Sequence, residues 1–491
     1  MTFTSLSFVS FFVLITVIYY ICPKKHRWAI LLIGSSYFYM AFVPKYIFIL
    51  FALVLIDFIL AKNIEKSVGK RRKLFFIGSI ISNIGILFVF KYFNFFSENI
   101  SAIDKLIHWN YSVGFLKILL PLGLSFHTFQ SLSYVIEVYR GKYKAEGHLG
   151  IYALYVFFFP QLVAGPIERP EHLLPQLKKE IYFDWSNILS GLRLMAWGFF
   201  KKLVVADRLA ISVTYIYAHI LSVPGLSILI TMIFFAIQLY ADFSGYSDIA
   251  RGSAKVLGID VVRNFAEPYF STSIAEFWRR WHISLSSWFR DYFYFPLAYS
   301  RKKVTRLWLY VCVVLTFLVT GLWHGAGWTF MVMGALYGIY IVFGLITKSW
   351  REALIKWVRL DHIPHLHKTL QIIFTFILVS FSWIFFRSPN MQTALTFIRQ
   401  LFVGWNMSVP QLIQGYILEP FQNLGFGQNE FIISLIGILV IIIVEHIQNK
   451  KLWGFFDSKT LLVRSFVYSI LIMSIFIFAV STNQQFIYFQ F

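Results

Sequence analysis

Residues 307–346 of the sequence read LWLYVCVVLTFLVTGLWHGAGWTFMVMGALYGIYIVFGLI, two long apolar runs separated by one histidine and a cluster of glycines. Each run approaches the roughly 20 apolar residues that a helix needs to cross a hydrocarbon core of about 30 Å. Basic residues stand before the first run, at 301–306, and after the second, at 348–351. Because short basic loops stay in the cytoplasm, the pattern predicts a membrane hairpin with His324 near its far end.

The composition extends this prediction to the whole chain. Of its 491 residues, 58% are hydrophobic, 20% are aromatic and 14% are charged, with a mean hydropathy of +0.67. Such a chain is too apolar for a soluble protein, and no run alternates as a transmembrane barrel strand does. We therefore predict an all-α, polytopic integral membrane protein with about 11–12 transmembrane helices plus re-entrant and interfacial amphipathic helices.

Charge and cysteine content exclude several classes of function. The net charge of +21 comes from 44 Lys+Arg against 23 Asp+Glu, and the basic residues gather in short loops between apolar runs. This distribution follows the positive-inside rule and predicts no nucleic-acid partner. Cys22 and Cys312 lie in or beside apolar runs, so we expect neither a disulfide framework nor a metal cluster. Residues 1–21 lack the features of a cleaved signal and are expected to form a first helix with an extracytoplasmic N-terminus.

The apolar runs define an expected order of spans. We treat residues 1–491 as one membrane domain, made of N-terminal helices (1–147), a catalytic core (148–387) and C-terminal helices (388–491). Residues 152–163 are too short and too rich in breakers for a span, which predicts a broken or re-entrant helix. The expected spans are 3–22, 28–42, 44–61, 74–90, 118–139, 187–206, 224–243, 307–323, 328–346, 369–386, 430–447 and 463–481.

Residues 277–292 have the pattern of an amphipathic helix. Trp278, Trp281 and Trp288 recur at helical spacing on one face, and Arg279, His282 and Arg290 share another. Tryptophans on the apolar face predict a helix lying in the membrane interface. Taken alone, this pattern favours a membrane-surface helix with no chemistry.

His324 is the residue that the hairpin singles out. An ionisable residue inside a membrane is a functional candidate, although a histidine hydrogen-bonded at a helix end would give the same pattern. Seventeen helical residues from Leu307 put it on the order of 25 Å from the cytoplasmic end. A histidine so far across suits a reaction whose substrates arrive from opposite faces, which is our hypothesis.

Two histidine motifs carry a family resemblance. The tract Phe277–Leu285, FWRRWHISL, followed some forty residues later by Trp323-His324-Gly325, resembles the membrane-bound O-acyltransferase family. It is most similar to the bacterial branch that contains alginate and peptidoglycan O-acetyltransferases, with teichoic acid D-alanyl transferases more distant. Supporting motifs lie at 121–126, 161–167, 240–246 and 385–387.

The resemblance implies acetyl transfer from a cytoplasmic thioester, acetyl-CoA, to an extracytoplasmic polysaccharide, with a partner protein completing the transfer. It implies His324 as base and His282 as a positioning partner, because a thioester needs mainly a base and a donor to the oxyanion. No bound cofactor or metal is implied, and the expected location is the bacterial inner membrane. Candidates for a donor path, each with an interior structural role as the alternative, are Asp242, Asp248, Arg279, Arg290, Trp323 and Gly325.

Two other classes of function stay open on the sequence. A transporter of a polysaccharide or lipid carrier also needs many spans, broken helices and buried charges. A scaffold of a secretion complex would use the histidines only for its fold. The two histidine motifs favour the enzyme, because transport alone does not demand them.

Overall fold

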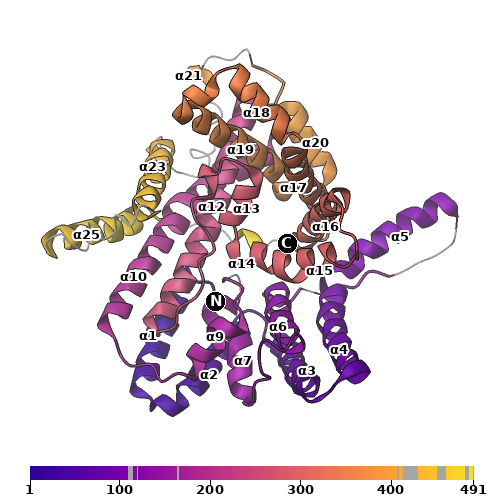
Figure 1. The fold of residues 1–491 in the computed structure, drawn as a ribbon. Helices are drawn as coiled ribbons and strands as arrows, with labels where there is room; N and C mark the ends of the chain where they lie inside the picture. Colours follow the sequence, from indigo (N-terminus) through magenta and orange to yellow (C-terminus); the bar gives the residue numbers. More distant parts are fainter. Residues whose placement is uncertain are drawn as a thin grey trace. The chain divides into compact units, whose positions relative to one another are not determined.

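The chain folds into two compact units in a computed structural model, which describes residues 1–108, 114–118, 120–162, 165–405, 409–412, 429–449, 461–480 and 486–489. The first unit contains Met1–Met195 and Ser247–Arg263, and the second contains Ala196–Tyr246 and Asn264–Phe491. Figure 1 colours the chain from its N-terminus to its C-terminus. Two of the three boundaries fall inside helices, α10 and α12, so each of these helices contributes residues to both units, and the third lies in the loop after α12. The division of the chain into segments 1–147, 148–387 and 388–491 stays a prediction.

All regular secondary structure among the described residues of the first unit is helical. Its elements are α1 (Leu6–Ile21), η1 (Lys24–His26), α2 (Arg27–Met40), η2 (Pro44–Tyr46), α3 (Ile47–Lys66), α4 (Gly69–Leu87), η3 (Phe88–Tyr92), α5 (Phe93–Ile107), α6 (Leu124–Tyr139), α7 (Leu149–Phe157), α8 (Phe159–Leu162), α9 (Pro170–Lys178), the first part of α10 (Trp185–Phe199) and the last part of α12 (Gly225–Val256).

Helices α3, α4 and α6 pack together around polar side chains. The carboxylate of Asp57 on α3 is fully buried and accepts hydrogen bonds from the Ser79 hydroxyl (2.5 Å) and the Asn83 amide (2.9 Å) of α4. All of α6 except Ile136 and Tyr139 is buried. This helix, rich in polar side chains, therefore faces the interior of the protein along almost its whole length.

The segment predicted as a broken helix is broken. Helix α7 ends at Phe157, and the short helix α8 begins two residues later, with both helices buried. Pro160 lies inside α8, where the absent amide hydrogen prevents a regular continuation from α7. Residues 163 and 164 of the predicted segment lie outside the described residues.

The second unit holds the predicted hairpin. Its elements are η4 (Phe200–Ala206), α11 (Asp207–Ala218), η5 (Ile220–Ser222), α12, η6 (Pro268–Phe270), α13 (Ile274–Arg280), α14 (Ile283–Phe289), η7 (Arg290–Tyr294), α15 (Phe295–Ala298), α16 (Arg306–His324), α17 (Trp328–Ile346), α18 (Lys348–Trp357), η8 (Leu360–His362), α19 (Pro364–Arg387), α20 (Met391–Gln400), α21 (Val409–Leu412), α23 (Asn429–Asn449), α25 (Leu461–Phe478) and η10 (Ile487–Phe489).

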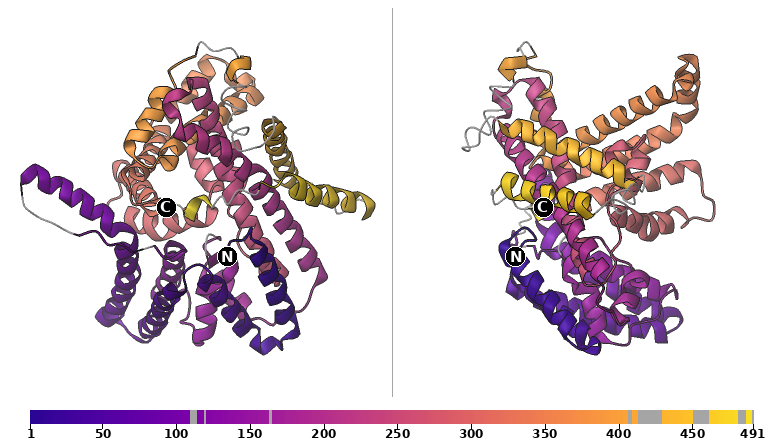
Figure 2. Two further views of the ribbon diagram at one scale, coloured as in Figure 1. Left: turned by 180° about the vertical axis from the view of Figure 1, so that it is seen from behind. Right: turned by 90° about the vertical axis from the view of Figure 1, so that its left-hand side faces the viewer.

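Helices α16 and α17 form the hairpin and pack along each other, as Figure 1 shows, with the same pair seen from behind and from the side in Figure 2. Glycines allow the close approach. A Cβ at Gly321 would collide with the backbone carbonyl of Phe330, and one at Gly338 would lie 2.9 Å from the Cα of Val314. The space beside these glycines is thus occupied by the facing helix.

Seven helices in the described part of the chain are long and apolar enough to cross a membrane. Their ranges are Pro44–Lys66, Gly69–Ile107, Gly225–Val256, Arg306–His324, Trp328–Ile346, Pro364–Arg387 and Asn429–Ile447, and the shorter helices Leu6–Ile21 and Leu462–Phe478 are also apolar. No strand occurs among the described residues. The predicted all-α polytopic membrane protein is confirmed.

Two of the predicted elements that differ from the structure supply residues of the second unit. The helix predicted over 224–243 continues to Val256, and its residues 244–256 are largely buried in protein. The predicted interfacial helix 277–292 is instead two short helices, α13 and α14. Their tryptophans are buried in the unit, where Trp278 packs on Tyr337 (ring centroids 4.9 Å apart) and Trp281 packs on Trp383 (5.2 Å). Partners distant in the sequence cover the apolar face, and the sequence pattern alone does not reveal them.

Candidate functional site

His282 stands at the break between α13 and α14. Its backbone is left-handed, with φ of 44°, and its side chain is fully buried. Asn264 stabilises the turn at His282. Its backbone carbonyl accepts a hydrogen bond from the Ile283 amide (2.9 Å), and its side-chain oxygen accepts one from the Ser284 hydroxyl (2.7 Å). A non-glycine residue persists in this conformation only where its surroundings enforce it, which is a mark of functional positions.

His324 is the last residue of α16 and is 4% exposed. The Trp323 ring lies beside both motif histidines, with its centroid 6.1 Å from that of His282 and 4.9 Å from that of His324. Aromatic rings complete the surroundings: Phe243 lies 4.7 Å from His282, and Phe386 lies 5.7 Å from His324. The fold therefore brings the two histidines predicted from the sequence into one buried cluster with Trp323, Phe243 and Phe386, named the histidine chamber below.

Tyr488 is a residue of this chamber that sequence reasoning missed. Its ring centroid lies 5.8 Å from that of His324 and 6.5 Å from that of His282. Its hydroxyl is buried and has no hydrogen-bond partner within the described part of the chain. The only signal in the sequence is the aromatic cluster Phe486-Ile487-Tyr488-Phe489 after a polar stretch. That signal does not indicate proximity to residues more than 160 positions earlier.

Helix α12 holds the segment that carries Tyr488. Asp242 accepts a hydrogen bond from the backbone amide of Ile487 (2.9 Å), the Phe243 ring lies 4.5 Å from the Tyr488 ring, and the Tyr246 ring stacks on Phe486 at 4.4 Å. The three contacts come from one face of α12, and they hold both the backbone and the side chains of residues 486–488 in position.

A buried ion-pair network supports Asp242. The Lys202 ammonium lies 2.8 Å from Asp242 and 2.7 Å from Asp207, and all three side chains are at most 5% exposed. Of the two interpretations given to Asp242 from the sequence, the structure thus shows the interior ion pair. Asp248 belongs to the other unit and lies 3.6 Å from Arg251.

The other donor-path candidates fall into two groups. Arg279 and Arg290 line one cavity of 600 Å³ bounded by α13, α14, η7, α16 and α17. Thr316 and Thr320 also line it, about two turns and one turn before His324 on α16. Trp323 lies in the histidine chamber, whereas Gly325 faces the Phe330 ring, which a Cβ at this position would overlap.

The arrangement of these groups defines a class of chemistry. Two imidazoles and one phenol converge in a chamber otherwise walled by aromatic rings, at the end of a membrane hairpin. An imidazole is the usual general base for deprotonating a hydroxyl, and a buried hydroxyl can donate a hydrogen bond to a developing oxyanion. The fold and site thus define a polytopic helical membrane protein equipped for acyl transfer to an alcohol.

Comparison with known proteins identifies the family. The model of the membrane-bound O-acyltransferase family matches residues 146–387, which include both histidine motifs. The peptidoglycan O-acetyltransferase of Helicobacter pylori is 32% identical over 403 residues, covering 77% of this chain and 73% of its own. The chain belongs to the membrane-bound O-acyltransferase family and is an O-acyltransferase.

Other relatives support the same assignment. The probable alginate O-acetylase AlgI of Azotobacter vinelandii is 34% identical over 397 residues, covering 80% of this chain and 76% of its own. The teichoic acid D-alanyltransferase of Bacillus subtilis is 27% identical over 277 residues, covering 54% of this chain and 68% of its own. The family resemblance predicted from the two histidine motifs is confirmed.

Proposed function

We propose that this enzyme transfers an acetyl group from cytoplasmic acetyl-CoA, across the bacterial cytoplasmic membrane, for O-acetylation of an extracytoplasmic polysaccharide. The observation that carries the proposal is the convergence of His282, His324 and Tyr488 in one buried chamber at the end of a membrane hairpin. The names of the relatives support the acceptor class, because both alginate and peptidoglycan are polysaccharides.

In the proposed step, His324 takes the proton of an acceptor hydroxyl as the oxygen attacks the thioester carbonyl. A C–O bond forms, the C–S bond breaks, and the thiolate of CoA leaves and receives the proton from His324. Tyr488 donates a hydrogen bond to the oxyanion that develops on the carbonyl oxygen. His282, fixed by its left-handed turn and with its ring 6.1 Å from that of Trp323, orients the reacting groups.

The cavity next to the chamber suits the donor. Arg279 and Arg290 offer guanidinium groups to the phosphates of a nucleotide carrier, and guanidinium matches phosphate geometry bidentately. The Thr316 and Thr320 positions continue the cavity wall along α16 in the direction of His324. Arg290 is exposed and lies 2.8 Å from the Asp291 carboxylate, which an incoming phosphate would have to displace.

The hairpin supports the proposed direction of transfer. The 19 residues of α16 span about 28 Å at 1.5 Å per residue, which is close to the thickness of the hydrocarbon core. The basic stretches 301–306 and 348–351 flank the hairpin at its other end and favour a cytoplasmic location for that end. With the N-terminus extracytoplasmic, His324 then lies near the outer face, where a partner protein would take the acetyl group on to the polysaccharide.

One proteoliposome experiment separates acetyl transfer from transport. Right-side-out proteoliposomes are loaded with radiolabelled acetyl-CoA and given an external polysaccharide with a candidate partner protein. We expect label on the external polysaccharide with the native enzyme and none with His324→Ala. His365→Ala, which changes an exposed histidine, is the matched control and should transfer normally. Normal transfer by His324→Ala would refute the proposed mechanism. Release of intact radiolabelled acetyl-CoA from the proteoliposomes would indicate a transporter.

A further inference from the structure

A cationic cavity lies in the first unit, and none of the residues that line it is assigned to acyl transfer. It has a volume of 180 Å³ and is formed by the ends of α1 and α9, the start of α2 and Ile259. Five cationic side chains line it against the single carboxylate of Glu180, and they are Lys24, Lys25, Arg27, Lys178 and Lys179. Trp28, Leu31 and Ile151 supply an apolar wall.

Three of the five cations already have partners in the protein. Arg27 donates to three backbone carbonyls, including that of Ile181 at 2.6 Å. Lys24 lies 3.4 Å from Glu180, and Lys178 lies 2.5 Å from the buried carboxylate of Glu146. Even with Glu146 counted, the five cations exceed the carboxylates by three. Lys25 and Lys179 form no ion pair with any residue that the structure describes, so their charge is left for a ligand.

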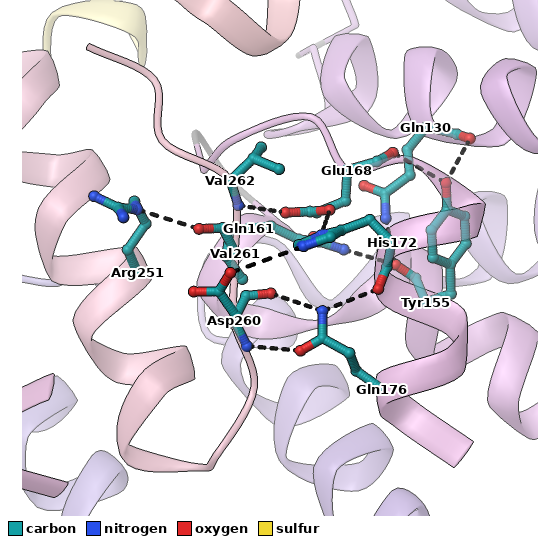
Figure 3. A network of polar contacts seen from close by, with 10 residues as sticks. All are labelled: Gln130, Tyr155, Gln161, Glu168, His172, Gln176, Arg251, Asp260, Val261 and Val262. Atoms are coloured by element: carbon teal, nitrogen blue, oxygen red, sulfur yellow. Dashed lines mark hydrogen bonds and ion pairs between the residues drawn. The ribbon is translucent and has the colours of Figure 1, made fainter. Parts of the chain in front are cut away.

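The wall of this cavity is held by a polar network, shown in Figure 3. The Gln176 side chain accepts a hydrogen bond from the Asp260 amide (2.8 Å) and donates one to the Asp260 carbonyl (3.0 Å). Glu168 accepts from the Val262 amide (2.7 Å) and contacts His172 (2.7 Å). Gln176 and Ile259, both lining residues, are thereby fixed before any ligand arrives.

We propose that this cavity binds a phosphate group. Convergent ammonium groups with unbalanced positive charge are the usual protein environment for phosphate, and the preformed wall lowers the cost of ordering them. The apolar wall accommodates the remainder of the ligand. The basic loop 23–27 favours the cytoplasmic side, where two sources of phosphate meet the protein: anionic phospholipid headgroups and soluble nucleotides. The site stands independently of the acyl-transfer proposal.

Binding measurements with two probes test the site and identify its source of phosphate. Short-chain phosphatidylglycerol and coenzyme A are titrated separately into the purified protein in a neutral detergent. We expect at least one probe to bind about tenfold more weakly to Lys25→Ala/Lys179→Ala, because two lysines then no longer reach the phosphate. The probe whose binding depends on these lysines identifies the source of the phosphate, either a phospholipid headgroup or a soluble nucleotide.

The matched control removes two lysines from another basic loop. Lys66→Ala/Lys70→Ala changes the net charge equally, and both side chains are exposed and outside the cavity. Its affinity for the responsive probe should equal that of the native protein. Equal weakening in both double variants would show only a general effect of net charge and would overturn the proposal, as would unchanged binding of both probes to Lys25→Ala/Lys179→Ala.

Discussion

The carboxylate of Asp242 accepts a hydrogen bond from the backbone amide of Ile487 at 2.9 Å, and this bond fixes the residue that precedes Tyr488. The two residues are 245 positions apart in the sequence. Lys202 holds the same carboxylate from its other oxygen at 2.8 Å. A buried charge network in the second unit thus determines where a hydroxyl group lies relative to His324.

Asp242→Asn should separate this positioning from the fold. The amide keeps an oxygen that can accept from Ile487 but loses its attraction to Lys202, which retains Asp207. We expect acetyl transfer to fall about tenfold, with a larger effect on kcat than on KM, because loosening Tyr488 weakens transition-state contacts more than donor binding. Steady-state kinetics of the purified enzyme measure both constants. An unchanged kcat would mean that Asp242 contributes to stability alone.

Tyr488→Phe removes one oxygen and keeps the ring contacts with Phe243 and Phe386. If the hydroxyl donates to the oxyanion, its loss should lower kcat on the order of 10²-fold, the effect of removing one such donor. The melting temperature should change little, because the aromatic packing is retained. Tyr299→Phe removes a hydroxyl from an exposed ring and should leave kcat unchanged. Full activity in Tyr488→Phe would exclude the hydroxyl from the reaction.

His282→Asn tests the second histidine without disturbing its backbone. Asparagine tolerates the left-handed conformation better than most residues, so the turn at φ of 44° should persist. We expect kcat to fall at least tenfold while the protein still inserts and purifies as a folded species. His282→Ala is a poorer test because alanine is strained in this conformation. Retained activity in the asparagine variant would assign His282 a purely structural role.

The sequence was sufficient to predict the hairpin and to predict that the His282 and His324 motifs act together. It was not sufficient where contacts between residues far apart in the sequence determine the structure. Apolar length and basic flanks are local properties, and they predicted α16 and α17 with His324 at the turn. The break at His282 and the burial of Trp281 depend on Asn264 and Trp383, which no helical periodicity reports. Tyr488 is held beside the histidines by the hydrogen bond between Asp242 and the Ile487 amide, a contact that only the folded chain reveals.

The close approach of α16 and α17 predicts a sharp difference between two glycines. In Gly321→Ala the new methyl group would meet the Phe330 carbonyl and approach the Gly334 Cα to 3.2 Å, so the helices must separate. We expect a loss of about 1–3 kcal/mol of stability, the usual cost of overpacking. Gly327→Ala has its nearest neighbour at 3.6 Å, an ordinary contact, and should melt close to the native temperature. Equal melting temperatures for the two variants would contradict the packing described.

The pair formed by Glu168 and His172 should make stability depend on pH. His172 Nδ1 donates a hydrogen bond to the buried Glu168 carboxylate, 2.7 Å away, and this bond raises the pKa of His172 above its ordinary value of about 6.5. Because the folded pKa exceeds the unfolded one, the pair stabilises the protein fully below the unfolded pKa and loses this contribution as pH rises through the folded pKa. The native protein should therefore melt higher than His172→Gln at about pH 6, and the difference should shrink by about pH 9. Melting curves of both proteins across this range measure the difference, and a gap that widened with pH would show that the neutral histidine is the stabilising form.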